Sequence, residues 1–404
     1  MQPFAALRPW ATTLLIAGAG YFVDLFDLTL FGVVRVASLR AIGVTSPAEV
    51  LNAGLWIYNA QMAGLLIGGL MWGMLADWRG RRSVLVGSIL LYSLASLASA
   101  AVQDVTMYAV VRFLAGLGLA GEVGAAIVLV SETLPRELRG LGTTVVTTFG
   151  LLGVTAAALS EQWLSWRAAY LLGGVLGLVL LLARWQLPES PLFLRSRALR
   201  GSRWALVRGT ALRRLMACVA AGIPVYFTTS VMLTFSPEIA AGLAVQGAVS
   251  AGRAVLIGSI GLAVGDLLAG LLSQHLRRRK PVLYGCLASG AVLLVLLTQV
   301  TNRSPTAYYL LTAGLCTAAG YWAVLMTLSA EQFGTNVRGM VATAVPNVVR
   351  GSALFAASGF GALKARMPVP SAALIVGAVC FALAVVSLTQ LDETFDRELD
   401  YVET

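Results

Sequence analysis

The sequence predicts an all-α polytopic membrane protein with twelve transmembrane helices in two pseudo-symmetric six-helix bundles. Three observations lead to this fold class: an apolar composition, the spacing of long apolar stretches and an internal repeat. Of the 404 residues, 58% are hydrophobic and 12% are charged, and the mean hydropathy is +0.81. A soluble globular protein carries about 25% charged residues. The composition therefore disfavours a soluble enzyme, a nucleic-acid-binding protein and a disordered protein, despite the net charge of +10.

The apolar stretches are long enough to cross a bilayer, for which a helix needs about 20 residues. The capping box Ser46-Pro47-Ala48-Glu49 marks the start of the second span. The first stretch is longer than a signal-peptide core, so we expect it to remain as a helix. We expect the apolar segment 236–251 to extend one of its two neighbours. The expected spans are 11–37, 51–75, 84–102, 105–130, 140–160, 167–187, 212–235, 252–275, 282–300, 306–330, 340–363 and 369–391.

The basic residues predict the orientation of these spans. With the N-terminus inside, twenty lysines and arginines fall on the cytoplasmic side and seven on the opposite side. Cytoplasmic loops are enriched in Lys and Arg, so we expect a multi-pass protein of the bacterial inner-membrane type with both termini in the cytoplasm. The expected parts are an N-terminal bundle (1–187), a cytoplasmic linker (188–211), a C-terminal bundle (212–391) and an acidic cytoplasmic tail (392–404).

Two pairs of motifs recur at nearly the same offset, which indicates an internal repeat. Gly73–Arg82 (G-M-L-A-D-W-R-G-R-R) corresponds to Gly270–Arg279 (G-L-L-S-Q-H-L-R-R-R), 197 residues later. Glu132–Gly140 (E-x-x-P-x-x-x-R-G) corresponds to Glu331–Gly339 (E-x-x-G-x-x-x-R-G), 199 residues later. Two copies of one six-helix unit are typical of secondary transporters, whose substrate site lies near the bilayer midplane at the interface of the repeats.

The motifs of the first half resemble those of a known transporter superfamily. Gly73–Arg82 resembles the signature loop of the major facilitator superfamily, G-x-L-A-D-R-x-G-R-R. Asp24–Gly32 and Arg112–Glu122 resemble the helix 1 and helix 4 patterns of its metabolite:proton symporter family, and Glu132–Gly140 and Pro188–Pro191 also fit. The resemblance implies the major facilitator fold, transport by alternating access and a gate built from the loop motifs. The implied gate residues are Gly73, Asp77, Gly80, Arg81, Arg82, Glu132, Arg139, Glu331 and Arg338.

The two copies of the signature loop differ at one acidic position. Asp77 is able to meet the positive N-terminal end of a neighbouring helix, whereas the second copy has Gln274 at the corresponding place. We therefore expect an acidic latch in the first half alone.

Ionisable groups within the predicted spans are the candidates for proton coupling, because a charge at bilayer depth is costly. Asp24 and Asp27 lie on one face of the first span. Asp27 and Arg112 lie about 10–15 Å below the outer ends of their helices, at 1.5 Å per residue, so they can pair. Such a pair is either a proton switch or a static ion pair that fixes packing. Glu122 lies about 15 Å deeper than Arg112 and is either a second proton or substrate site or a packing carboxyl.

Arginines within the spans are the candidates for binding a substrate. A guanidinium grips a carboxylate with two parallel hydrogen bonds and stays charged, and Arg112 and Arg350 supply one from each half. Asp266 lies at the depth of Arg350, where we favour a structural role. The alternative is a cation site made of the carboxylates, with structural arginines. The other candidates, each weighed against a packing role, are Tyr226, Tyr321, Trp322, Asn59, Gln61 and Asn347.

The sequence therefore predicts a secondary active transporter and not an enzyme, most simply a proton-coupled symporter for uptake of a small carboxylate-bearing organic solute. Its expected partners are this solute, protons and the lipid bilayer, with no cofactor, metal or nucleic acid, and we expect a monomer. The four cysteines are too far apart in sequence to suggest a metal site. The sequence has no P-loop motif for ATP, and the fifth span lacks the Gly-Pro pair of the superfamily's drug:proton antiporters. The alternatives are an exporter or uniporter of a larger organic compound or cation, and a transport-dead membrane sensor.

Overall fold

The computed structural model describes residues 10–79, 81–122, 134, 136–185, 209–299, 301 and 304–395. Its description of side chains leaves out positions 73, 76–79, 81–83, 136–141, 143–144, 184–185, 335–336, 338–340 and 342–343. Contacts divide the chain into two compact units, Met1–Leu199 (unit 1) and Arg200–Thr404 (unit 2). The division falls within the segment 188–211, of which the structure describes residues 209–211.

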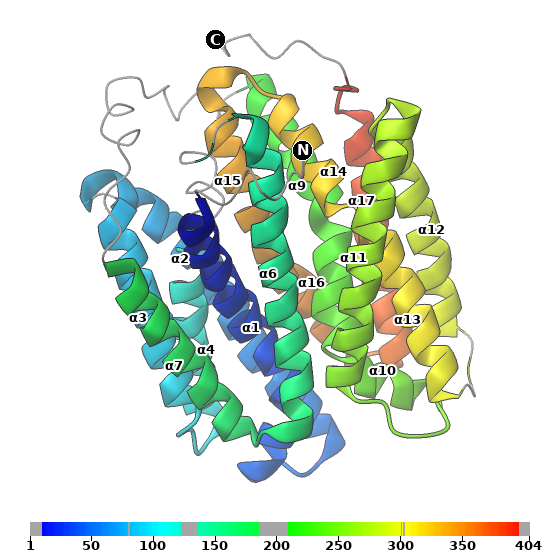
Figure 1. Ribbon diagram of the computed structural model, residues 1–404. Helices are drawn as coiled ribbons and strands as arrows, with labels where there is room; N and C mark the ends of the chain where they lie inside the picture. Colours follow the sequence, from blue (N-terminus) through cyan, green and yellow to red (C-terminus); the bar gives the residue numbers. More distant parts are fainter. Residues whose placement is uncertain are drawn as a thin grey trace. The chain divides into compact units, whose positions relative to one another are not determined.

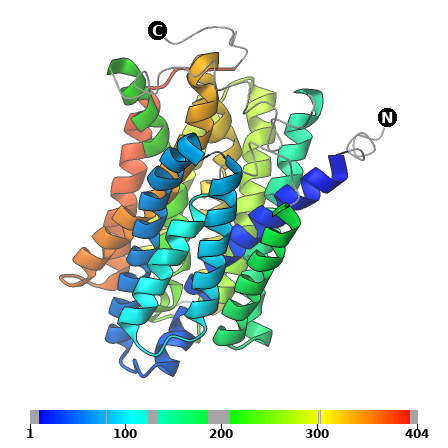
Figure 2. The same ribbon diagram turned by 90° about the vertical axis from the view of Figure 1, so that its left-hand side faces the viewer.

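Unit 1 is a bundle of helices in which α1 packs against α6 and α7, and α2 packs against α4 (Figure 1). In the same unit α3 contacts both α4 and α7 (Figure 2). The helices are α1 (Ala11–Ala41), α2 (Pro47–Arg79), α3 (Arg81–Ser99), α4 (Val105–Leu119), α6 (Arg136–Trp163) and α7 (Trp166–Trp185).

Unit 2 is also a bundle of helices, in which α11 packs against α13, and α12 and α9 pack against α17. Its elements are α9 (Gly209–Phe227), the π-helix η3 (Thr228–Leu233), α10 (Ser236–Gly242), α11 (Ala251–Leu276), α12 (Lys280–Gln299), α13 (Pro305–Ala319), α14 (Trp322–Glu331), α15 (Thr335–Gly351), α16 (Ala353–Lys364) and α17 (Val369–Thr389).

Glycines at equivalent positions bring equivalent helix pairs together in the two units. A Cβ at Gly64 or Gly68 of α2 would collide with backbone atoms of α4. A Cβ at Gly261 or Gly265 of α11, 197 residues later, would collide with backbone atoms of α13. Small residues allow membrane helices to approach closely, so the internal repeat read from the loop motifs extends to the packing of the helices.

The expected span 306–330 corresponds to one apolar segment long enough to cross a membrane, Pro305–Glu331, but its helix is interrupted at Gly320 and Tyr321, where α13 ends and α14 begins. Gly320 has the non-helical dihedrals φ −79° and ψ 63° and lies tightly against the backbone of α11. The Ala323 N–H, in the first turn of α14, has a hydrogen-bond acceptor on α11: it donates to Asp266 Oδ1 at 2.7 Å. In unit 1, α4 likewise ends at Leu119, and the turn Gly121–Glu122 follows it at the equivalent place.

Two further predicted spans are interrupted. The span 212–235 begins earlier, at Gly209, and changes from α- to π-helix after Phe227. Pro224 lies one turn before this change: it has no N–H for the helix ladder, and its carbonyl accepts the Thr228 hydroxyl at 2.8 Å. The ambiguous segment 236–251 extends neither neighbour and instead contains the short helix α10. The span 340–363 is divided at Ser352.

Eight segments of the described chain are long and apolar enough to cross a membrane, and two shorter apolar helices, Val84–Ser99 and Val105–Leu119, accompany them. The regular secondary structure in the described ranges is all helical. These features confirm the predicted class of an all-α polytopic membrane protein.

Candidate functional site

The structure brings Asp27 of α1 and Arg112 of α4 together inside unit 1. The Arg112 Nη2 lies 3.3 Å from Asp27 Oδ2, and both side chains are 0% exposed. Nη2 also donates to the Asp27 backbone carbonyl at 3.1 Å, and Nη1 lies 3.5 Å from Oδ1. Asp27 and Arg112, which lie at similar predicted depths, are therefore paired. The two guanidinium nitrogens approach Asp27 in the forked geometry that arginine is suited to make.

Each member of the pair has a neutral hydrogen-bond partner on a further helix. Gln61 of α2 accepts from Arg112 Nε at 3.3 Å, while its own amide donates to the Leu28 carbonyl at 3.3 Å. Ser96 of α3 donates to Asp27 Oδ1 at 2.6 Å. Gln61, which the sequence offers as a substrate contact, thus holds the guanidinium against α1.

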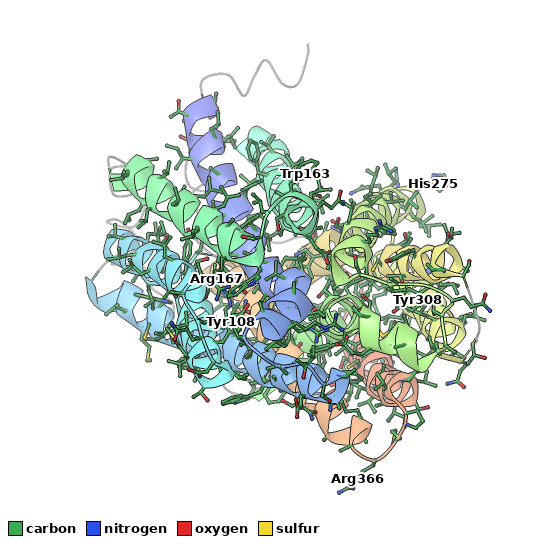
Figure 3. The ribbon with its side chains drawn as sticks, turned by 90° about the horizontal axis from the view of Figure 1, so that it is seen from below. Tyr108, Trp163, Arg167, His275, Tyr308 and Arg366 are labelled. Atoms are coloured by element: carbon green, nitrogen blue, oxygen red, sulfur yellow. The ribbon has the colours of Figure 1, made fainter. Side chains whose placement is uncertain are left out.

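A cluster of hydroxyl groups adjoins the pair. The hydroxyls of Tyr108 and Tyr170 are 2.7 Å apart, and Tyr108 donates to Ser38 at 3.1 Å. The Arg112 Cζ lies 5.3 Å from the centre of the Tyr170 ring. Figure 3 looks onto the end of unit 1 where Tyr108 and Arg167 lie. The cluster joins α1, α4 and α7 around the guanidinium.

A buried ion pair of this kind is expensive to keep. Desolvation of the two charges offsets much of their attraction, and removing one partner leaves the other charge buried, at a cost of about 3–5 kcal/mol. Neutralising Asp27 would therefore leave the Arg112 guanidinium buried without its counter-charge.

The two other carboxylates of the predicted coupling set are also fully buried. Asp24 lies one turn before Asp27 on α1, and Glu122 lies in the turn that follows α4.

A second group of site candidates meets inside unit 2, where three helix ends converge. Arg350 lies at the end of α15, Tyr226 in the last turn of α9 and Trp322 at the start of α14. Arg350 Nε donates to the Tyr226 hydroxyl at 3.1 Å, and the guanidinium-bearing residue is 2% exposed. The Tyr226 and Trp322 rings pack edge to face with centroids 5.6 Å apart. The Arg350 guanidinium and the rings of Tyr226 and Trp322 therefore lie next to one another.

The remaining candidates of unit 2 have structural contacts. The Tyr321 hydroxyl donates to the Ala221 carbonyl at 3.0 Å in a fully buried position, which ties α14 to α9. Asp266 caps the N-terminus of α14, so the structure gives it a backbone partner. Asn347 lies one turn before Arg350 and is partly buried. In unit 1, Asn59 is also partly buried, and its Oδ1 has no hydrogen-bond partner among the described residues.

For most predicted gate residues the structure describes no side-chain contacts. Gly80 and Glu132 lie beyond the described ranges, as do residues 188–191. The side chains of Asp77, Arg81, Arg82, Arg139 and Arg338, and the surroundings of Gly73, are likewise not described.

Glu331 is the predicted gate residue whose contacts the structure describes. Its two carboxylate oxygens accept from Arg279 Nε and Nη2 at 2.7 Å each, and the Thr394 hydroxyl donates to it at 2.7 Å. Arg279 belongs to the second copy of the signature loop. The second-half motifs are thus joined to each other and to the segment that follows α17.

Sequence reasoning did not single out Ser96, Tyr108 or Tyr170, which surround the ion pair. Serine and tyrosine hydroxyls are common in helix packing, so residue type alone does not mark them. A signal was present in α3, where Ser88, Ser93, Ser96 and Ser99 are all fully buried and recur at short intervals.

The family model described as Major Facilitator Superfamily matches residues 17–358. The chain is 32% identical over 317 residues to the 3-(3-hydroxy-phenyl)propionate transporter of Escherichia coli (strain K12), covering 75% of each chain. It is 32% identical over 203 residues to the putative niacin/nicotinamide transporter of Bacillus subtilis (strain 168), covering 49% of this chain and half (50%) of that protein's length. The crystal structure of a D-xylose-proton symporter shares the fold, with a TM-score of 0.75 and 18% identity over 96% of this chain and 99% of that chain.

Proposed function

Because the chain belongs to the Major Facilitator Superfamily, and is thus a membrane transporter and not an enzyme, we propose that it is a proton-coupled symporter for the uptake of a small aromatic carboxylate. The single observation that carries the coupling is the fully buried ion pair between Asp27 and Arg112. We further propose that the protein works as a monomer in a bacterial inner membrane.

Protonation is the event that changes this pair. When Asp27 takes up a proton, the attraction that holds the Arg112 guanidinium to it is lost, and the guanidinium turns toward an anionic partner. A substrate carboxylate then replaces the Asp27 carboxylate as the counter-charge, so proton and substrate bind cooperatively. One proton crossing 100 mV supplies about 2.3 kcal/mol, roughly a fifty-fold concentration gradient.

The substrate class rests on chemistry within unit 2 and on the relatives. Arg350 offers a fork for a carboxylate, and the ring pair of Tyr226 and Trp322 offers edges and faces to an aromatic ring. Niacin and 3-(3-hydroxyphenyl)propionate, which name two of the relatives, are both aromatic carboxylates. Within unit 2, Arg350, Tyr226 and Trp322 are therefore the substrate-binding residues that we propose, beside Arg112 of unit 1. Tyr321 and Gln61 support neighbouring helices instead.

The decisive experiment is transport into proteoliposomes that contain the purified chain. We expect an imposed inward proton gradient to drive accumulation of labelled niacin or 3-(3-hydroxyphenyl)propionate. Asp27→Asn mimics the protonated carboxyl, so accumulation is lost while counterflow exchange of the same compound persists. Normal gradient-driven accumulation by Asp27→Asn contradicts the coupling role of Asp27. Transport that ignores the proton gradient in the unaltered protein favours the uniporter, and an absence of flux favours the sensor.

A further inference from the structure

Ser96 of α3 has one hydroxyl proton and two acceptors within reach. Its Oγ lies 2.6 Å from Asp27 Oδ1 on α1 and 3.3 Å from the Tyr170 backbone carbonyl on α7. A serine hydroxyl donates one hydrogen bond and accepts others. With Asp27 ionised, the shorter contact to the carboxylate takes the proton, because hydrogen bonds to charged groups are the stronger ones.

The packing around Ser96 makes the second acceptor accessible. Gly173 of α7 presents no side chain there, and a Cβ at this glycine would lie 3.3 Å from Ser96 Oγ and 3.2 Å from the Phe26 ring. Glycines at 174 and 177 likewise let α3 approach the backbone of α7. The serine hydroxyl therefore sits between a titratable side chain and a helix backbone, and it is fully buried.

A proton on Asp27 reverses the direction of the first hydrogen bond. The proton forms an O–H bond at Oδ1, and this new donor points to Ser96 Oγ, the nearest acceptor. Ser96 then cannot donate to Oδ1, so its own proton rotates toward the Tyr170 carbonyl. No bond to Ser96 is broken, and one proton has been added in total.

We propose that Ser96 is a hydroxyl switch that passes the protonation state of Asp27 to α7 through the Tyr170 carbonyl. This inference rests on the proposed coupling role of Asp27 and assigns Ser96 as a positioning residue. The signal reaches the partner of Asp27 by a second route, because the Tyr170 hydroxyl pairs with Tyr108, one turn before Arg112 on α4. Protonation thus acts on the guanidinium directly and through the helix beside it.

Several charged and titratable groups surround Asp27. The charged and titratable side chains that face it are Arg112 and Tyr108 from α4 and Tyr170 from α7. The amide of Gln61 stands on the α2 side against Arg112. Asp24 lies on α1 itself. A test must therefore alter Ser96 and leave all of these in place.

Infrared difference spectroscopy of the reconstituted full chain, titrated with acid in the absence of substrate, tests the proposal. The carboxyl band of Asp27 is the one that Asp27→Asn removes. In Ser96→Ala the ionised carboxylate loses a donor, so we expect the midpoint of this band to move upward by about one to two pH units. The amide carbonyl band that changes together with Asp27 protonation should disappear in the same variant.

Ser99→Ala is the matched control, because Ser99 is equally buried on α3 and donates to the Ala95 carbonyl of its own helix. It should titrate as the unaltered protein does. A Ser96→Ala titration that superimposes on that of Ser99→Ala overturns the switch while leaving the coupling role of Asp27 intact. If Asp27→Asn removes no titrating band, Asp27 does not exchange protons and both proposals fail.

Discussion

In unit 2, Arg350 is the residue whose chemistry favours an anionic substrate over a cationic one. Arg350→Lys keeps the charge but loses the planar fork, so binding of an aromatic carboxylate should weaken by about 1.5–3 kcal/mol, roughly 10- to 150-fold in Kd. Calorimetry on the purified protein measures this, with niacin compared against its neutral amide, nicotinamide.

Arg366 supplies the control for this substitution. It is an exposed residue that Figure 3 shows at the periphery, so Arg366→Lys should leave the affinity unchanged. Equal binding of the acid and the amide by the unaltered protein would contradict the anion site.

Glu393, in the segment after α17, gives the protein a dependence on acid. Partial burial raises its pKa, but the backbone N–H groups of Arg279, Lys280, Phe395 and Thr394 donate to it and lower the net pKa below 4.5. The ionised form is thus favoured in the folded state, so its stabilising effect is complete above pH 4.5 and is lost as the pH falls through the lowered pKa. Glu393→Gln should therefore lower the Tm at pH 7 and lose this difference in acid.

Thermal unfolding in detergent at a series of pH values checks this. Parallel Tm curves for Glu393→Gln and the unaltered protein down to acid pH would contradict the assignment, because a loss of packing alone does not depend on the charge of Glu393.

Single residues of the candidate site differ in how far the sequence predicts their contacts. Asp27 and Arg112 could be paired in advance, since depth along two helices follows from counting residues. Tyr321 could not be assigned, because whether its hydroxyl meets a substrate or the Ala221 carbonyl depends on the rotation of α14. Ser96 was missed for the same reason: a serine's role depends on what stands opposite it.

Among the helices, two neighbouring glycines of α2 make a sharp test of packing. A Cβ at Gly68 would meet the backbone of Leu117 on α4, whereas one at Gly69 would meet nothing within 4 Å. Gly68→Ala should therefore destabilise unit 1 by about 1–3 kcal/mol. Gly69→Ala should be neutral or stabilising by up to about 1 kcal/mol, since alanine favours helix.

Denaturant titration of the two variants in matched detergent measures these differences. The repeat offers a second pair, because Gly265 of α11 is blocked by the backbone of α13 and Gly270 faces open space. Similar effects at the blocked and open positions in either unit would mean that close approach of the helices does not depend on these glycines.

Helix interruptions were the least predictable feature at this scale. Mean hydropathy identifies an apolar segment, but it does not depend on whether the backbone hydrogen bonds within that segment are continuous. The segment 306–330 was therefore expected to be one helix. The break at Gly320 depends on the carboxylate of Asp266, which replaces a missing intrahelical acceptor from another helix. This hydrogen bond joins two different helices, so the local sequence around Gly320 does not predict it. The proline at position 224 was a visible signal for the change at η3.

At the scale of the whole molecule, the orientation across the membrane remains a prediction. We propose that both termini and the 188–211 linker are cytoplasmic. In intact cells, a membrane-impermeant thiol reagent should label Ser304→Cys and leave Ser202→Cys unlabelled, measured in a background without the four native cysteines. Labelling of Ser202→Cys from outside would reverse the topology.

The structure sharpens the charge bias behind this prediction. Arg35 is one of the seven basic residues assigned to the outer side from the sequence, but α1 continues to Ala41 and buries Arg35 completely. Its removal from the outer group increases the excess of cytoplasmic lysines and arginines. The fold class itself was predictable because composition, apolar length and the repeat are properties of the whole chain. They do not depend on any one contact.

A practical boundary follows from the contacts beyond α17. Gln390 accepts from Arg213, Lys280 donates to the Leu391 carbonyl, and the Asp392 backbone exchanges hydrogen bonds with Gln332. The chain is therefore still part of unit 2 well after its last helix has ended at Thr389. A purification tag or reporter belongs after Phe395. A fusion placed directly at the end of α17 would disrupt the hydrogen bonds by which residues 390–392 join α9, α12 and the end of α14.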